Sequence, residues 1–217
     1  MAIEFGRRGY RLELAGRRTD ALEATLLKAG SPGDFRGLDV TRDSAIREWA
    51  RDRIERLGAP AIVVPAAGSG RIGAAEGTTG AELSAMLAVN LVGAADTIQA
   101  FLPAMRAAGS GLIVALLSVA ARRSFAGWSA YGASKAGLAA YLQALRLELA
   151  GSGVRILEVY PGATDTPIWD ALPGSWDRGA MMKSPEVASA VVACALAGAS
   201  VTVEELHLGP AGGALSG

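Results

Sequence analysis

Hydrophobic residues follow two alternating patterns along the chain. Short β-like runs, some of them apolar at every position, predict strands at 10–15, 35–39, 61–66, 112–117, 154–160 and 202–208. The longer segments between them carry apolar residues at helical spacing and predict helices at 19–29, 42–57, 80–107, 129–150 and 185–198. Strand, helix and strand in this rhythm indicate parallel βαβ units with right-handed crossovers. The pattern therefore predicts an α/β fold around a parallel sheet of about six strands.

One long segment has neither pattern. Residues 162–184 form an irregular stretch that contains Trp169, Trp176 and the pair Met181-Met182. Loops of this length in a compact domain are often lids or binding loops. An ordinary surface loop that tucks its apolar residues into the core is equally supported. No linker, internal repeat or low-complexity tract divides the chain, so we expect a single domain over 1–217.

The charge balance narrows the classes of partner. The 21 lysines and arginines equal the 21 aspartates and glutamates, which gives no reason to expect a nucleic-acid surface or a polybasic membrane patch. The charged start lacks the long apolar segment of a signal peptide, so we expect none, and the most apolar run, 112–121, is too short to span a bilayer. We therefore expect a soluble, cytoplasmic protein that binds neither nucleic acid nor membrane.

A single cysteine and a single histidine limit the chemistry further. One thiol makes no internal disulfide, and one thiol with one imidazole builds no zinc site, so we predict no metal. A Ser-His-Asp triad would need His207, which lies on a predicted terminal strand without a G-x-S-x-G elbow. A hydrolase is thus the least supported enzyme class.

A glycine-rich run, 68–73, fits the G-x-G-x-x-G dinucleotide fingerprint in its letters only. That fingerprint needs a helix that begins within the glycines, and an acidic residue or an arginine at the tip of the next strand. Here the next helix is predicted to begin only near Thr79, and the next strand ends at Ser118. With 28 glycines in the chain the pattern is weak, and we interpret the run as a flexible strand-to-helix loop.

The strongest chemical signal lies in 118–149. Tyr131 and Lys135 are four residues apart at the head of an amphipathic helix, so both side chains project from one face. The four tyrosines and three lysines give about 0.06 such pairs by chance, so a solvated lysine beside a packed tyrosine is disfavoured but stays open. Ser118 lies thirteen residues earlier, at the carboxyl end of a predicted parallel strand, where open α/β sheets bind their ligands.

These residues match the Ser and Tyr-x-x-x-Lys pattern of the short-chain dehydrogenase/reductase family, which the chain resembles over essentially its whole length. Further matches follow the family's order: Asp39 and Val40 in "LDV", Asn90 in "AVNLVGA", and Pro161, Gly162, Thr164 and Thr166 in "YPGATDTPIW". Several matches in the right order are more specific than any one of them. The resemblance implies a Rossmann-like doubly wound parallel sheet with helices on both faces.

The resemblance also implies hydride transfer between a nicotinamide and a carbonyl or alcohol. Tyr131 would be the general acid/base, Ser118 would hold the substrate oxygen, and Lys135 would grip the nicotinamide ribose. A tyrosine has a pKa near 10, and an ammonium about 5 Å away supplies about 3 of the roughly 4 kcal/mol needed to reach neutrality. We therefore expect Lys135 to lower the pKa of Tyr131. Asn90 would anchor a water in a proton relay, although a helix residue that bonds only locally is at least as well supported.

Cofactor choice is predicted from the end of the first strand. NAD-preferring members of the family carry an acid where this chain has Gly16, and here Arg17 and Arg18 follow instead. Guanidinium groups suit a 2′-phosphate, so we expect NADP(H) rather than NAD(H), with solvated surface arginines as the alternative. The resemblance places the adenine at Asp39 and Val40.

The remaining cofactor contacts and the partners come from the resemblance. Pro161, Gly162 and Thr166, with the backbone of Thr164, would meet the nicotinamide, and Gly68 stands in the family's Asn-Asn-Ala-Gly loop. Family members are commonly dimers or tetramers through two long helices, here 80–107 and 129–150, so we expect a homodimer or homotetramer. The tryptophans and methionines of 162–184 favour a small, apolar carbonyl or alcohol substrate.

One family element has no counterpart in the sequence. The family begins with a strand and a T-G-x-x-x-G-x-G loop that seats the pyrophosphate, whereas "MAIEFGRRGY" resembles the end of the helix after that loop. Roughly 20 residues of the usual plan are missing, and the strands at 10–15 and 61–66 should have unpaired edges. A mis-set start or a trimmed chain is favoured by the intact Ser118, Tyr131 and Lys135. The alternatives are a natural variant whose strands close up, and a non-catalytic binding or scaffold protein.

Overall fold

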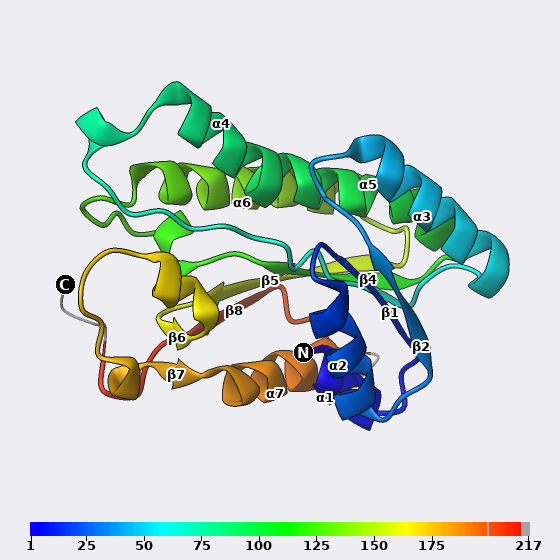
Figure 1. Cartoon of the computed structure of the whole chain (residues 1–217). Coiled ribbons are helices and arrows are strands. Elements are labelled where there is room, and N and C mark those ends of the chain that lie inside the picture. Colours follow the sequence, from blue (N-terminus) through cyan, green and yellow to red (C-terminus); the bar gives the residue numbers. More distant parts are fainter. Residues whose placement is uncertain (199, 214–217) are drawn as a thin grey trace.

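Parallel strands form the centre of the fold. The structure, a computed structural model, describes residues 1–198 and 200–213. Four strands, β3 (Ile62–Val63), β4 (Gly111–Leu116), β5 (Val154–Pro161) and β8 (Glu205–Leu208), make one parallel sheet in the order β3-β4-β5-β8 (Figure 1). Two more, β1 (Leu12–Gly16) and β2 (Gly33–Gly37), pair in parallel with each other. A short parallel pair, β6 (Thr164–Asp165) and β7 (Met182–Lys183), lies between β5 and the helix that leads to β8.

Helices cover both faces of these strands. On one face lie α3 (Asp43–Leu57), α4 (Gly80–Leu87), α5 (Gly93–Ala107) and α6 (Ser129–Glu148), and on the other α1 (Ala2–Arg7), α2 (Thr19–Ala29) and α7 (Ser184–Ala195) (Figure 1). The connections through α3, α4–α5 and α6 cross one face and those through α2 and α7 cross the other, which is the arrangement of a doubly wound sheet. The expected Rossmann-like α/β fold is therefore confirmed.

The core lies on both sides of β4 and β5. Ile113 and Ala115 of β4 join the apolar cluster under α5 and α6, whereas Leu112 and Val114 join the cluster that α7 and α1 cover. Successive side chains of a strand point to opposite faces, so a parallel strand between two helical layers must be apolar at every position. This two-sided burial explains why the run 112–117, which predicted β4, is apolar at every position.

The observed elements follow the predicted periodicity, with local corrections. The strand expected over 61–66 is a strand only at Ile62–Val63, because Pro65 has no N–H to donate and the ladder to β4 holds two register pairs. The helix expected over 80–107 is interrupted by a π-helical turn at Ala88–Val92. The helix expected to reach residue 198 ends at Ala195, since Leu196 already leaves the helical conformation. The irregular segment 162–184 contains β6, β7 and two 3-10 turns.

The edges of β1 and β3 agree with the expectation from the missing family element. Within the described residues β1 is hydrogen-bonded only to β2, and β3 only to β4, so one edge of each strand has no ladder partner. Leu12 and Leu14 of β1 pack in the same apolar cluster as Ile62 of β3. Side chains rather than backbone hydrogen bonds therefore join the two sheets.

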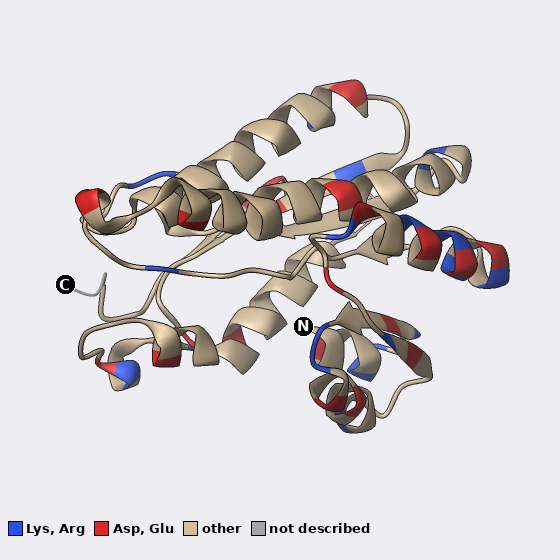
Figure 2. Ribbon diagram, turned by 45° about the horizontal axis from the view of Figure 1, so that its top comes forward, with Lys and Arg blue, Asp and Glu red and all other residues tan. Residues whose placement is uncertain are grey.

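The helical stretch α4–α5 is unusually apolar. Gly80–Ala107 is long and apolar enough to cross a membrane by length and composition alone, a feature that the sequence pattern did not single out. Its residues Ile98, Phe101 and Met105 are buried in the core, which is where a core helix places its apolar stripe. Figure 2 shows charged residues crowded on α3 and around α1 and α2, while the ribbons of α4, α5 and α6 are mostly uncharged.

Candidate active site

The first turns of α6 bring Tyr131 and Lys135 to the carboxyl end of β4. Both project from one face of the helix, and Nζ of Lys135 lies 6.0 Å from the centroid of the Tyr131 ring. The lysine is buried, with 6% of its surface exposed, and its Nζ donates a hydrogen bond to the Leu116 carbonyl at 2.7 Å. The helix therefore fixes the spacing of the pair, and β4 supplies the anchor for the ammonium.

Ser118 completes this group of polar side chains. It follows β4 in an extended conformation, and its Oγ accepts a hydrogen bond from the Ala120 N–H at 3.1 Å, which caps a 3-10 turn at Val119–Ala121. Its hydroxyl interacts with that of Tyr131 and acts to lower the pKa of the tyrosine. The structure thus brings together Ser118, Tyr131 and Lys135, as the sequence spacing predicted.

Burial controls the protonation of both groups on α6. Loss of solvent raises the pKa of Tyr131 above its ordinary value, and the Ser118 hydroxyl offsets only part of this effect. The same cause lowers the pKa of Lys135 to about 8. The expectation that Lys135 lowers the pKa of Tyr131 is therefore wrong for this structure. The ammonium is directed to the Leu116 carbonyl, and desolvation of the phenol dominates.

Asn90 ties the loop after β3 to α6. It lies in the π-helical turn Ala88–Val92 and is 1% exposed. Its Oδ1 accepts from the Ser69 N–H at 2.8 Å, while its Nδ2 donates to the Ser69 carbonyl and to Ser134 Oγ, each at 2.9 Å. The alternative of purely local bonding is wrong, because all three partners lie outside its own helix. The water-anchoring role of Asn90 stays a prediction.

The loop at 68–70 lies against these residues. A Cβ at Gly68 would lie 3.6 Å from Oδ1 of Asn90 and 4.0 Å from Nζ of Lys135. The following helix begins only at Gly80, where Thr79 and Glu82 form a capping box. The interpretation of this run as a strand-to-helix loop, and not as a dinucleotide fingerprint, is therefore confirmed.

The residues expected at the nicotinamide lie at the end of the neighbouring strand. Pro161 ends β5, and the Gly162 N–H donates to the Leu208 carbonyl at 2.8 Å. Thr164 Oγ1 donates to the Gly162 carbonyl at 3.1 Å, and the Thr166 carbonyl accepts a hydrogen bond from an arginine side chain. Since β4 and β5 are adjacent and parallel, these residues and Ser118 lie at one edge of the sheet.

The residues expected at the adenosine end lie at the same edge of the β1–β2 pair. Arg17 and Arg18 follow β1 and are exposed. Asp39 follows β2, and hydrogen bonds from Thr41 lower the pKa of its carboxyl, with a smaller contribution from Arg17. Val40 lies against the start of α5. The predicted cofactor contacts at Arg17, Asp39 and Pro161 therefore lie at the carboxyl ends of strands that belong to two separate sheets.

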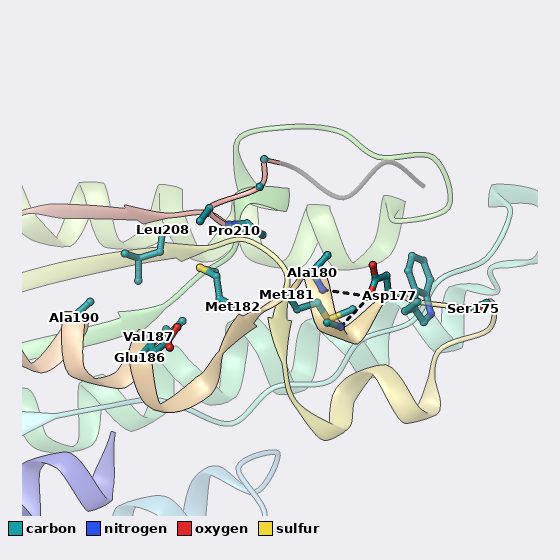
Figure 3. Close-up of a pocket in the computed structure, with 16 residues that line it drawn as sticks. Ser175, Asp177, Ala180, Met181, Met182, Glu186, Val187, Ala190, Leu208 and Pro210 are labelled. Atoms are coloured by element: carbon teal, nitrogen blue, oxygen red, sulfur yellow. Dashed lines mark hydrogen bonds between the residues drawn. The ribbon is translucent and has the colours of Figure 1, made fainter.

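A hollow in the surface lies away from these residues. It has a volume of about 770 Å³ and is formed by the segment around 175–182, by α7 and by 208–213 (Figure 3). Its walls include Trp176, Met182 and Leu208, and none of the four candidate catalytic residues lines it. Met181 is buried, so the segment tucks at least one of its apolar residues inward, as the surface-loop alternative predicted.

Sequence reasoning missed two residues at the site. The Trp128 ring lies 5.3 Å from the ring of Tyr131, in an edge-to-face arrangement. Ser134 is fully buried and joins Asn90 to the Tyr131 carbonyl, to which its Oγ donates at 2.7 Å. The position of Trp128 one turn before the tyrosine was a usable signal. The partner of Ser134 is 44 residues away, and no local pattern indicates it.

Comparison with known proteins places this arrangement in a family. The sequence profile described as short chain dehydrogenase matches residues 1–174. An uncharacterised oxidoreductase of Myxococcus xanthus is 36% identical over 165 residues, which are 75% of this chain and 65% of that protein. A glycine betaine reductase of Emericella nidulans is 35% identical over 195 residues, 88% of this chain and 15% of that protein. The chain thus spans less than two thirds of the length of these two relatives.

A solved structure gives the same result for the fold. An alcohol dehydrogenase from the archaeon Thermococcus sibiricus, complexed with 5-hydroxy-NADP, aligns with 100% of this chain and 93% of its own. The identity is 29% and the TM-score is 0.89. Together with the match over 1–174, this shows that the chain belongs to the short-chain dehydrogenase/reductase family.

Proposed function

We propose that the chain is an NADP(H)-dependent oxidoreductase that interconverts a carbonyl and an alcohol by hydride transfer. The observation that carries the proposal is the convergence of Ser118, Tyr131 and Lys135 at the carboxyl end of β4. A phenol, a hydroxyl and an ammonium in one buried place can hold a carbonyl oxygen and move a proton to it. Membership of a dehydrogenase family supports this chemistry.

The residues present fit NADP(H) at its two ends. Lys135 and Tyr131 would hold the nicotinamide ribose, with Gly162 and Thr166 beside the ring. At the other end Arg17 and Arg18 would take the 2′-phosphate, and Asp39 and Val40 the adenine. Within residues 1–198 and 200–213 neither Arg17 nor Arg18 lies within ion-pair distance of a carboxylate, so both guanidinium groups are open to an anion. The T. sibiricus enzyme, with its NADP derivative, supports the same choice.

The chain's own groups account for the proton in the reaction. NADP(H), when bound, would supply or accept the hydride at the carbonyl carbon. Ser118 donates a hydrogen bond to the carbonyl oxygen, and the Tyr131 hydroxyl gives that oxygen its proton as the alcohol forms. A pKa raised by burial keeps Tyr131 protonated, which is the form that reduction needs. In the direction of oxidation the same hydroxyl would take the proton back.

We also propose a homodimer or homotetramer that meets through α4–α5 and α6. The weakly charged ribbons of these helices support this, as does Val92, which is half exposed at 49% (Figure 2). Light scattering coupled to size exclusion gives the oligomeric state directly. A small apolar substrate and a cytoplasmic location without nucleic-acid or membrane partners complete the proposal.

Nucleotide titration and one substitution test the function. Calorimetry should give tighter binding of NADPH than of NADH, and Arg17→Ala with Arg18→Ala should remove that preference. Tyr131→Phe should abolish turnover and leave NADPH affinity largely intact, because only one hydroxyl is lost and Lys135 still holds the ribose. Tyr141→Phe is the matched control, since Tyr141 lies on the same helix and its hydroxyl accepts a hydrogen bond from Gln99 at 3.4 Å, away from the candidate site.

Two outcomes would contradict the proposal. A Tyr131→Phe protein that keeps most of its rate would remove the tyrosine from its role. A chain that binds neither NADPH nor NADH would instead support the alternative of a binding or scaffold protein.

A further inference from the structure

Aromatic rings follow one another from Tyr131 into the segment between β5 and α7. The Tyr131 and Trp128 ring centroids are 5.3 Å apart. Trp128 lies 6.0 Å from Trp169, and Trp169 lies 4.9 Å from Trp176. Three of the four tryptophans of the chain therefore form one series of ring contacts that starts at the ring of the candidate catalytic tyrosine, whereas Trp49 packs against the core. The three in the row are only half-buried and keep surface for a ligand.

The orientation of the central ring is fixed by polar contacts. Trp169 Nε1 donates to the Thr164 carbonyl at 2.8 Å, which anchors one edge of the indole to β6. Arg178 forms ion pairs with Asp165 at 2.6 Å and with Asp170 at 2.8 Å, and so closes the turn that carries the tryptophan. A ring held in this way presents a preformed surface, and less entropy is lost when a ligand binds to it.

A glycine and an isoleucine also lie near Tyr131. A Cβ placed on Gly70 would lie 3.0 Å from Cδ1 of Ile168 and 4.0 Å from Cδ2 of Tyr131. Gly70 therefore lies between the Ile168 side chain and the edge of the Tyr131 ring. The nearby guanidinium of Arg178 is already paired with two carboxylates, so it offers little to an acidic substrate.

We infer that the substrate carries an aromatic ring next to its carbonyl carbon, and that Trp128 and Trp169 recognise this ring by edge-to-face contact. The inference rests on the proposed function, because the carbonyl oxygen must lie at Ser118 and Tyr131. A ring pair in this geometry stabilises beyond the area that it buries, by about 2- to 12-fold in an equilibrium constant. A saturated ring of the same size fills the space but forms no such pair. The two tryptophans therefore select aryl over cycloalkyl ketones.

The test compares acetophenone with cyclohexyl methyl ketone. We measure kcat/KM for each from NADPH oxidation, and the ratio of the two removes effects that are common to both substrates. The ratio should fall about 5-fold in Trp128→Leu and in Trp169→Leu, because each loses one ring pair. Trp169→Phe keeps a ring and should restore most of the ratio. Phe125→Leu is the control, because this exposed ring faces Arg123, and the ratio should not change.

A second readout needs no turnover. Ligand-observed NMR gives the dissociation constants of 1-phenylethanol and 1-cyclohexylethanol, and the phenyl alcohol should bind more tightly to the wild type than to Trp169→Leu. Reduction of both ketones with a ratio that neither tryptophan changes would overturn the aromatic site and leave the proposed function standing. Failure to reduce either ketone, together with failure to bind NADPH, would overturn the proposed function itself.

Discussion

Replacing Lys135 by methionine should make the protein more stable while it abolishes turnover. The lysine is 6% exposed, and burial lowers its pKa from 10.5 to about 8. At about 1.36 kcal/mol for each pKa unit, the charged form costs the folded state about 3 kcal/mol at pH 7. Methionine has a similar length and no charge, so the Lys135→Met variant avoids this cost.

The hydrogen bond from Lys135 to the Leu116 carbonyl opposes this gain. A hydrogen bond from a charged donor is worth roughly 1.5–3 kcal/mol, so the net stabilisation should be about 1 kcal/mol. For a chain of 217 residues this raises the melting temperature by about 2–4 °C. The buried ammonium of Lys135 would thus lower the free energy of unfolding of the protein, as is common for functional groups at active sites.

The dependence on pH separates this mechanism from simple repacking. Between about pH 8 and 10.5 the unfolded lysine binds a proton and the folded lysine does not, so the wild type gains stability as the pH rises. The variant lacks this gain, and its advantage should shrink from pH 7 to pH 10. Urea unfolding followed by tryptophan fluorescence at pH 7, 8.5 and 10 measures the difference. Lys28→Met is the control, since Lys28 is exposed on α2 and its substitution should show no such trend.

One result would refute the reasoning about Lys135. If the methionine variant is less stable than the wild type by more than about 1 kcal/mol, with a difference that does not change from pH 7 to pH 10, the ammonium is not penalised by burial. The site would then have to be wetter than its 6% exposure implies.

Three further substitutions test contacts in other parts of the fold. Arg146→Met removes the partner of Glu158, a fully buried carboxylate 2.5 Å away, and urea unfolding should show a loss of about 3–5 kcal/mol; a loss below 1 kcal/mol would contradict the pairing. Gly93→Ala would place a Cβ 2.7 Å from the Val40 carbonyl oxygen, so calorimetry should show weaker NADPH binding, whereas unchanged affinity would separate Val40 from the cofactor. Gly153→Ala acts on a glycine with φ of +78°, where a Cβ would also clash with backbone, and we expect a destabilisation of more than about 2 kcal/mol; a melting temperature within 2 °C of wild type would be the contrary result.

Local rules explain why so much of the fold follows from the sequence. An apolar run such as 112–117 reads as a buried parallel strand because side chains on both of its faces must be covered. Tyr131 and Lys135 could be paired because residues four apart share a face of any α-helix. Ser118 could be placed because parallel strands end at one edge of the sheet. Each of these inferences needs only the geometry of one element or of two neighbours.

The places where local rules failed depend on particular neighbours. β3 is two residues long because only Ile62 and Val63 pair with β4, and Pro65, which follows shortly after, lacks a donor for the ladder. The π-helical turn at Ala88–Val92 interrupts a helix whose composition gives no sign of it. Its Asn90 bonds to Ser69 and Ser134, which approach it from other parts of the chain.

The sequence by itself determined the order of elements, the α/β class and the identity of the polar groups at the carboxyl edge, because backbone sterics and side-chain periodicity act over a few residues. Only the tertiary structure decided the pKa values of those groups and the contacts that they make. Desolvation raises the pKa of Tyr131 and lowers that of Lys135, and it depends on every atom that packs around them. The 6.0 Å contact between Trp128 and Trp169 likewise joins segments 41 residues apart, and the packing of the whole domain sets it.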